Sequence, residues 1–358
     1  MNREELVSKL EIVAPALSKT DLVRVLNHFW FDNNTLTAYN DLIAISTKLN
    51  SEFSGAVPGS TLMALLAKSR AEKVEFCTGS DGSKKIPEGQ LLVKAASSKF
   101  TLPYLETEAT KIFEMPEPGL NVALQVKLKE FLEAVELCML SLKEDPAIPD
   151  SLGVTLQFHP KHLDLYTTND ATITQASVDA GASEHTKPVV LSGSFCRQML
   201  ALAKTSEKLH LEIAENYSLF EAGDTTLFGK LVNVQRPLDF GAVIDQSFPV
   251  EMEEFLVSVP TKLELILDRA IVITDSKSEK PKTQIVVKDG IAKFYSQSDR
   301  GEVRDSVQLE ENVHPDVSVY IDPRLFKRGY GSFDRMLLTD KALIMTKENG
   351  MYLVSASV

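Results

Sequence analysis

Leu36-Thr-Ala-Tyr-Asn-Asp41 has two counterparts in this chain, Leu165-Tyr-Thr-Thr-Asn-Asp170 and Phe294-Tyr-Ser-Gln-Ser-Asp299. Each stretch alternates apolar and small polar residues and ends in an Asn-Asp or Ser-Asp pair, which predicts a strand that runs into a turn. The interval between the closing aspartates is 129 residues in both steps. A fixed period indicates three similar modules, so we expect function to lie in the geometry of an array rather than in one reactive pocket.

Length and composition are those of a multidomain globular protein. The 358 residues are too many for one comfortable core, and three modules of roughly 120 residues fall within the usual range of domain sizes. No run of about 18 apolar residues is present, so no membrane span is expected. The cysteines are scattered without metal or redox spacing, which is typical of a reducing cytoplasm: Cys77, Cys138 and Cys196.

Each module is predicted to run helix, strand pair, helix, strand hairpin. First helices are expected at residues 3–13, 126–142 and 261–271, and second helices begin near residues 59, 192 and 322. In the first helix of module 2, apolar spacing predicts one buried face made of Leu128, Leu132, Val135 and Met139. Asp322-Pro323 is a start signal, an N-cap followed by proline at the first helical position.

Two breaks divide the modules. Glu114-Met-Pro-Glu-Pro-Gly119 is a clear Pro/Gly linker, and Gln246-Ser-Phe-Pro-Val250 is a weaker one. The predicted domains are therefore 1–118, 119–248 and 249–358. Both linkers are short, so rigid neighbours are expected.

Positive charge recurs on the three predicted second helices. Segments 59–73, 192–208 and 322–331 each carry three Lys or Arg against one acidic residue, within a chain of net charge −12. A basic surface repeated once per module predicts contact with a polyanion. Exposed helices also carry Lys and Arg without any ligand, and this plainer interpretation stays open. The candidate DNA-contacting residues are Lys68, Arg70, Lys73, Arg197, Lys204, Lys208, Arg324, Lys327 and Arg328.

The order of elements over the whole chain resembles that of the bacterial DNA polymerase III beta subunit, the sliding clamp. The stretches that carry the resemblance are collinear rather than individually specific: Asn2-Arg-Glu-Glu-Leu6, Gly153-Val-Thr-Leu-Gln-Phe158 followed by Leu163 to Ser177, Pro188-Val-Val-Leu-Ser192, Phe228-Gly-Lys-Leu-Val232 with Pro237, and Val354 to Val358.

The resemblance implies an α+β fold of three repeated DNA-clamp domains, each with two inward-facing helices and outer antiparallel sheets. Two subunits would join head to tail, module 1 against module 3, in a homodimeric ring around double-stranded DNA. Such a ring binds DNA without sequence specificity and tethers the replicative DNA polymerase. Its expected partners are DNA, that polymerase and a clamp loader, with no membrane and no cofactor.

Members of the clamp family accept a short, largely apolar peptide from polymerases between their second and third domains. Carried over by position, the pocket residues are Leu152, Thr168, Asp170, Ala171, Thr172, Ile173, Pro237, Asp322, Leu325, Ile344, Ser355, Ala356, Ser357 and Val358. The loop Thr168-Asn-Asp-Ala-Thr-Ile173 departs from the common Thr-Asp-Gly-His-Arg-Leu, and the tail Ser355-Ala-Ser357 replaces frequent Met and Pro. We therefore expect a different peptide preference, as would suit a phage or plasmid clamp matched to its own polymerase.

No catalytic constellation is visible, so the chain is predicted not to be an enzyme. His159 and His162 are three residues apart, but Pro160 predicts a turn between them and no Cys or carboxylate cluster is expected to complete a metal site. Ser194 lacks the second glycine of a nucleophile elbow. The alternative to a ring is a clamp-fold scaffold or decoy that binds replication peptides and never encircles DNA.

Overall fold

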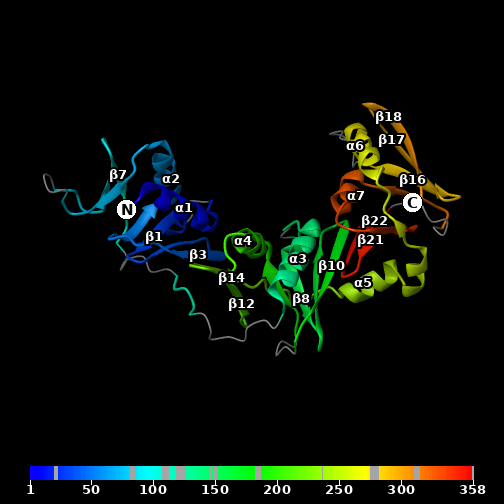
Figure 1. Cartoon of the computed structure of the whole chain (residues 1–358), viewed down its shortest axis with the longest axis horizontal. Helices are drawn as coiled ribbons and strands as arrows, with labels where there is room; N and C mark the ends of the chain where they lie inside the picture. The colour runs from blue at the N-terminus through cyan, green and yellow to red at the C-terminus, as the bar shows by residue number, and fades with distance from the viewer. Residues whose placement is uncertain are drawn as a thin grey trace. The chain divides into compact units, whose positions relative to one another are not determined.

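The structure is a computed structural model that describes residues 1–19, 23–80, 85–106, 113–117, 126–144, 147, 151–181, 187–235, 237–274, 282–309 and 315–356. Within this part of the chain, no helix is long and apolar enough to cross a membrane. The fold is α+β, built from short helices and antiparallel sheets (Figure 1).

One order of elements occurs three times. Each repeat starts with a helix, continues with three antiparallel strands, adds a fourth strand that leads into a second helix, and ends with three more strands. The first helices are α1 (Arg3–Val13), α3 (Leu128–Cys138) and α6 (Leu263–Thr274), and the second helices are α2 (Gly59–Lys68), α4 (Gly193–Ala203) and α7 (Pro323–Gly329). The predicted threefold repeat is therefore confirmed, but each repeat has four strands before its second helix and three after it, where a strand pair and a hairpin were predicted.

The strands follow the same order in each repeat. In the first they are β1 (His28–Asp32), β2 (Thr35–Tyr39), β3 (Ile43–Lys48), β4 (Ser54–Pro58), β5 (Val74–Cys77), β6 (Gln90–Ala95) and β7 (Ser98–Pro103). In the second they are β8 (Gly153–Phe158), β9 (His162–Thr168), β10 (Thr172–Asp179), β11 (Val189–Ser192), β12 (Leu209–Ile213), β13 (Tyr217–Ala222) and β14 (Thr225–Lys230). In the third they are β16 (Thr283–Lys288), β17 (Ile291–Ser298), β18 (Gly301–Gln308), β19 (Val317–Ile321), β20 (Arg335–Leu338), β21 (Ala342–Lys347) and β22 (Gly350–Ser355). The three quoted stretches lie on β2, β9 and β17, which are equivalent strands.

Strands also pair across the repeat boundaries. β14 of the second repeat pairs with β3 of the first, with Leu227 opposite Ile45, in a sheet of order β12-β13-β14-β3-β2-β1-β4. β22 of the third repeat pairs with β10 of the second, with Leu353 opposite Ile173, in a sheet of order β11-β8-β9-β10-β22-β21-β20-β15 (Figure 1). The last of these strands, β15, spans Val257–Ser258.

These shared sheets set the compact units of the chain. One unit contains Met1–Leu124 and Ser194–Leu231, and the other contains Gln125–Gly193 and Val232–Val358. The second repeat is thus divided, because each of its halves is hydrogen-bonded into a neighbour's sheet. The division into domains at 118/119 and 248/249 stays a prediction, and residues 118 and 119 lie outside the described part of the chain.

A helix ends within the stretch that the sequence suggested as the second linker. Helix α5 spans Phe240–Ser247, and a 3-10 helix follows at Val250–Phe255. Asp239 caps α5 by accepting a hydrogen bond from the backbone N–H of Ala242 at 3.0 Å. Phe240, Ile244 and Phe248 are buried, with exposed fractions of 7% or less. The stretch Gln246 to Val250 includes the end of α5 and the non-helical residues 248 and 249, and its role as a linker stays a prediction. The helix itself was not predicted, although an Asp cap and apolar residues at helical spacing signal it.

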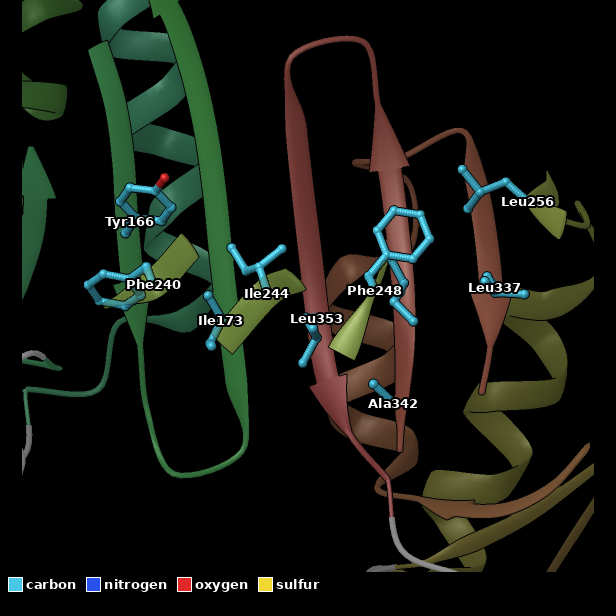
Figure 2. Packing of buried hydrophobic residues seen from close by; sticks show 10 residues of the cluster. Tyr166, Ile173, Phe240, Ile244, Phe248, Leu256, Leu337, Ala342 and Leu353 are labelled. Carbon is cyan, nitrogen blue, oxygen red and sulfur yellow. The ribbon is translucent and has the colours of Figure 1, made fainter. Parts of the chain in front are cut away.

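The helix α5 covers one face of the sheet that joins the second and third repeats (Figure 2). Phe240 stacks on Tyr166 of β9, with ring centroids 4.8 Å apart. The same cluster contains residues from β10, β22, β21 and β20: Ile173, Leu353, Ala342, Ile344 and Leu337. Side chains of two repeats therefore share one core at this junction.

The buried face of α3 differs from the predicted one. The buried stripe includes Phe131, Val135 and Cys138, whereas Leu128, Leu132 and Met139 are only partly buried. The buried face of α3 is the one that packs against β9 and β10, and Leu132 is turned away from its centre because it comes one residue after Phe131. The predicted stripe and the buried stripe share Val135, so the leucine pattern alone predicted a face whose centre is shifted from the buried one.

Candidate functional site

A groove lies beside the loop after β9, within the second compact unit. It has a volume of about 830 Å³. Its other walls are the start of α7 and the tail that follows β22. The lining residues are Leu142, Lys143, Asn169, Asp170, Ala171, Lys282, Tyr320, Asp322, Arg324, Leu325, Arg328, Ser355 and Ala356.

Asn169 shapes the loop wall of the groove. Its side-chain oxygen accepts hydrogen bonds from the backbone N–H groups of Ala171 at 2.9 Å and Thr172 at 3.0 Å. Its side-chain nitrogen donates to the carbonyl of Ser141 at 3.0 Å. Such an Asx turn fixes the loop without help from regular structure. Ser355 then donates its backbone N–H to the carbonyl of Ala171 at 2.8 Å and holds the tail against the loop.

Hydrogen bonds hold helix α7 in place beside this groove. Asp322 caps it by accepting the backbone N–H of Arg324 at 2.9 Å, as the sequence predicted, and Pro323 occupies the first turn. Arg328 donates to the carbonyl of Leu140 at 3.0 Å. Tyr352 donates its hydroxyl to the carbonyl of Leu325 at 3.1 Å. Burial raises the pKa of Tyr352 to about 12, so this donor stays protonated at neutral pH.

The groove combines apolar surface with an excess of positive charge. Lys143 pairs with Asp170 at 2.7 Å, and Arg324 pairs with Asp322 at 2.9 Å. Lys282 and Arg328 add two more cations to the lining, while Leu142, Tyr320 and Leu325 supply apolar surface. This arrangement suits an extended peptide that carries apolar side chains and a carboxylate.

The structure brings together six of the predicted pocket residues. The groove is lined by Asp170, Ala171, Asp322, Leu325, Ser355 and Ala356. Thr168, Thr172, Ile173 and Ile344 are buried, the last two in the core cluster of Figure 2. Leu152 and Pro237 lie outside the lining, and Ser357 and Val358 lie outside the described part of the chain.

Sequence reasoning missed several members of this groove. Lys143, Lys282, Tyr320 and Arg328 line it although none was assigned to it. A usable signal existed for Arg328, because it follows the predicted pocket residue Leu325 by three residues on the same helix. Lys143 and Lys282 come from loops far apart in the sequence, so no local pattern connects them.

The predicted DNA-contacting residues occupy two kinds of position. Arg70, Lys73, Lys204 and Lys208 follow the C-terminal ends of α2 and α4 rather than lying on them, so the prediction of basic helices needs correction there. Cations just past a helix end are favourable, because they complement the negative end of the helix dipole. Lys68 and Arg197 do lie on these helices, and all six side chains belong to exposed residues.

The α7 cations are engaged locally. Lys327 pairs with Asp268 of α6, whose carboxylate raises the pKa of that lysine. Arg324 and Arg328 both line the groove described above. Each of the three α7 residues named as a DNA contact therefore already bonds to another group of this chain: Arg324 to Asp322, Lys327 to Asp268 and Arg328 to the carbonyl of Leu140.

A carboxylate stands beside the two histidines that the sequence suggested were unsupported. His159, His162 and Asp164 offer ligand atoms that all lie within 4.8 Å of one another. The sequence analysis did not connect Asp164 with this pair, and the absence of a metal site stays a prediction. Asp164 follows His162 by two residues on β9, and alternation along a strand places both on one face.

With the fold and groove described, the class is clear: three helix-led repeats joined through shared sheets form the DNA sliding-clamp fold. The chain has the fold of bacterial DNA polymerase III beta subunits over its whole length. It is similar to the beta subunit of Thermotoga maritima, with a TM-score of 0.79, 17% identity, and coverage of 100% of this chain and 98% of that chain.

Two further structures give the same result. The beta subunit of Pseudomonas aeruginosa has a TM-score of 0.80 at 17% identity, covering 99% of this chain and 98% of that chain. The sliding clamp of Bacillus subtilis has a TM-score of 0.82 at 13% identity, covering 100% and 98%. Neither a protein-family model nor a curated protein sequence matches the chain.

Proposed function

We propose that this chain is a DNA sliding clamp, a processivity factor that encircles duplex DNA as a head-to-tail homodimer and tethers a replicative polymerase. The observation that carries the proposal is a strand-pairing rule used twice within the chain. The last strand of one repeat pairs with the third strand of the preceding repeat, as β14 with β3 and β22 with β10.

This pairing rule leaves one last strand and one third strand without a partner from another repeat. Among the described strands, β7 pairs with β6 on one side only, and β18 pairs with β17 on one side only. β7 is the last strand of the first repeat, and β18 is the third strand of the last repeat. Two copies can therefore satisfy both edges by pairing β7 of each with β18 of the other, which closes a ring.

Apolar residues beside β18 support this junction. Helix α6 lies against β17 and β18 (Figure 1) and exposes 62% of Leu265 and 66% of Val272. On α3, the first helix of the second repeat, the exposed residues include Glu133 and Glu136. Val272, Ile273 and Val303 line a groove at this edge. Aliphatic side chains next to an unpaired strand are typical of an interface.

Retention on DNA would come from topology, with phosphate contacts kept weak. The exposed cations after α2 and α4 supply sequence-independent attraction, while the net charge of −12 repels DNA from the rest of the surface. Weak contacts screened by salt permit sliding. The proposal assigns the chain no chemical step, and it places the protein in the cytoplasm of a bacterial or phage-infected cell.

The topological step is tested on circular DNA. The purified protein is loaded with a clamp loader on nicked circles, which are then cut once. We expect the protein to stay on intact circles at moderate salt and to leave after linearisation. Equal retention on circular and on linear DNA would contradict encirclement of DNA by a ring.

The same experiment addresses the scaffold alternative, which the local pairing of Arg324 and Lys327 favours. A scaffold that never encircles DNA would bind peptide but would show no retention on circles. Light scattering at micromolar concentration would then give a persistent monomer of 39.6 kDa.

Peptide binding in the groove gives a separate prediction. Leu325→Asp is expected to weaken binding of a fluorescein-labelled, largely apolar peptide of the cognate replicative polymerase by more than about tenfold, because burying an unpaired carboxylate is costly. Leu325 is in the first turn of α7, where an acidic residue is tolerated by the helix dipole. Fluorescence anisotropy measures the effect.

The matched control is Leu238→Asp, at a leucine that is 40% exposed and outside the groove. We expect the control variant to bind the peptide as the unchanged protein does. An equal loss in both variants would remove the groove as the peptide site.

A further inference from the structure

The turn between β8 and β9 brings two imidazoles together. His159 donates its backbone N–H to the carbonyl of His162 at 3.0 Å, closing a turn over Pro160 and Lys161. Residues that flank such a turn face each other across the hairpin. Their rings are stacked, with centroids 4.4 Å apart and planes 11° from parallel.

Asp164 completes a three-ligand cluster. Its Oδ2 atom lies 3.2 Å from Nε2 of His159 and 3.6 Å from Nε2 of His162. Ligand atoms around a tetrahedral zinc ion, bonded at 2.0–2.2 Å, lie about 3.3 Å from one another. The two separations in this chain are close to that edge length.

The hydrogen-bonding capacity of the Nε2 atom of His159 is not used. Within the described part of the chain, it is a buried atom with no hydrogen-bond partner. Its 3.2 Å separation from Asp164 lacks hydrogen-bond alignment, so the two groups are near each other without being bonded. A cation between a nitrogen lone pair and a carboxylate would satisfy both.

Asp164 is held in place by neighbours, as metal-ligating carboxylates are. Its Oδ1 accepts a hydrogen bond from the hydroxyl of Ser177, and its Oδ2 accepts one from Tyr166 at 3.2 Å. Outer partners of this kind orient a ligand before the metal arrives.

We propose that His159, His162 and Asp164 form a binding site for a divalent transition-metal ion of the zinc class. Two imidazoles and one carboxylate are ligands that zinc prefers, and three protein ligands leave one position for water. The site goes beyond the proposed clamp function and does not depend on it. The bound ion would link the β8–β9 turn to Asp164 on β9.

The surroundings favour a cation. His162 lines a groove whose other residues include Glu130, Asp179, Asp334 and Glu348. Carboxylates around one groove concentrate cations near it. A metal lies in the plane of each imidazole that binds it, so the stacked rings must open on binding. The His162 side chain is 48% exposed and has room to turn.

Zinc titration of the untagged full-length protein tests the site. Calorimetry is expected to give one equivalent of bound Zn²⁺, and Co²⁺ is expected to give the intense visible absorption of a four-coordinate ion. His159→Gln and His162→Gln should each weaken zinc binding by more than about tenfold. Chelator treatment of the zinc-loaded protein should lower its melting temperature.

His210→Gln is the matched control. His210 is 44% exposed and lies 2.9 Å from Glu212, which gives a strand-borne His and carboxylate pair without a second histidine. This variant should bind zinc as the unchanged protein does. Binding of less than one equivalent, or an affinity unaffected by either glutamine variant at the hairpin, would overturn the proposal. The cobalt spectrum of the unchanged protein tests the site even where a variant fails to fold.

Discussion

Val272→Asp is expected to convert the proposed dimer into a monomer. Val272 is 66% exposed on α6 and lines the groove beside the edge strand β18. Pairing of β18 with β7 of a second copy would bury this position. An unpaired carboxylate in such an interface costs several kcal/mol, which corresponds to a loss of dimer affinity of more than about a hundredfold. Light scattering should then give the single-chain mass of 39.6 kDa.

The matched control is Val250→Asp. Val250 is 74% exposed on the 3-10 helix Val250–Phe255, outside α6 and β18. This variant should remain dimeric and should stay on circular DNA, whereas Val272→Asp should lose both properties together. A dimeric Val272→Asp, or an equal effect of both substitutions, would contradict the pairing of β7 with β18.

Phe240→Ala is expected to cost about 3–5 kcal/mol of folding free energy, the usual effect of removing a buried aromatic ring. Phe240 is 1% exposed and stacks on Tyr166 in the core of Figure 2. Its loss opens a cavity under α5, where side chains of two repeats meet. The urea midpoint measured by far-UV circular dichroism should fall accordingly.

The fluorescence of the single tryptophan reports on only one of the two compact units in this experiment. Trp30 lies on β1, in the unit that does not contain Phe240. Tryptophan fluorescence should therefore report a smaller shift than circular dichroism for Phe240→Ala. Leu238→Ala, at a residue 40% exposed, is the control and should cost well under 1 kcal/mol. An unchanged midpoint for Phe240→Ala would contradict the anchoring role of α5.

Local signals predicted most elements of the fold. The strands β2, β9 and β17 follow from alternation and a closing turn, because these patterns are written within six residues. The start of α7 follows from Asp322 and Pro323 for the same reason. Helix α5 has an Asp cap and apolar residues at helical spacing, and both could be recognised in the sequence. The helix was not predicted because the adjacent Phe-Pro pair was interpreted as a linker.

The groove was predicted in position but only partly in composition. The loop after β9, the start of α7 and the tail were expected together because the resemblance places them so, and the structure brings them to one groove. Ile173 and Ile344 have pocket-like chemistry but serve the core instead. Apolar residues on a strand can face either the core or a ligand, and their sequence does not say which.

Residues that are neighbours along the chain were enough to predict the three repeats and the Asp322 cap of α7. The tertiary structure decided which strands join across repeats, as where Thr225 bonds to Thr47 at 3.0 Å across 178 residues. Pairing of distant edges depends on side-chain fit and register between separate segments, and that information is present only when both segments are folded together.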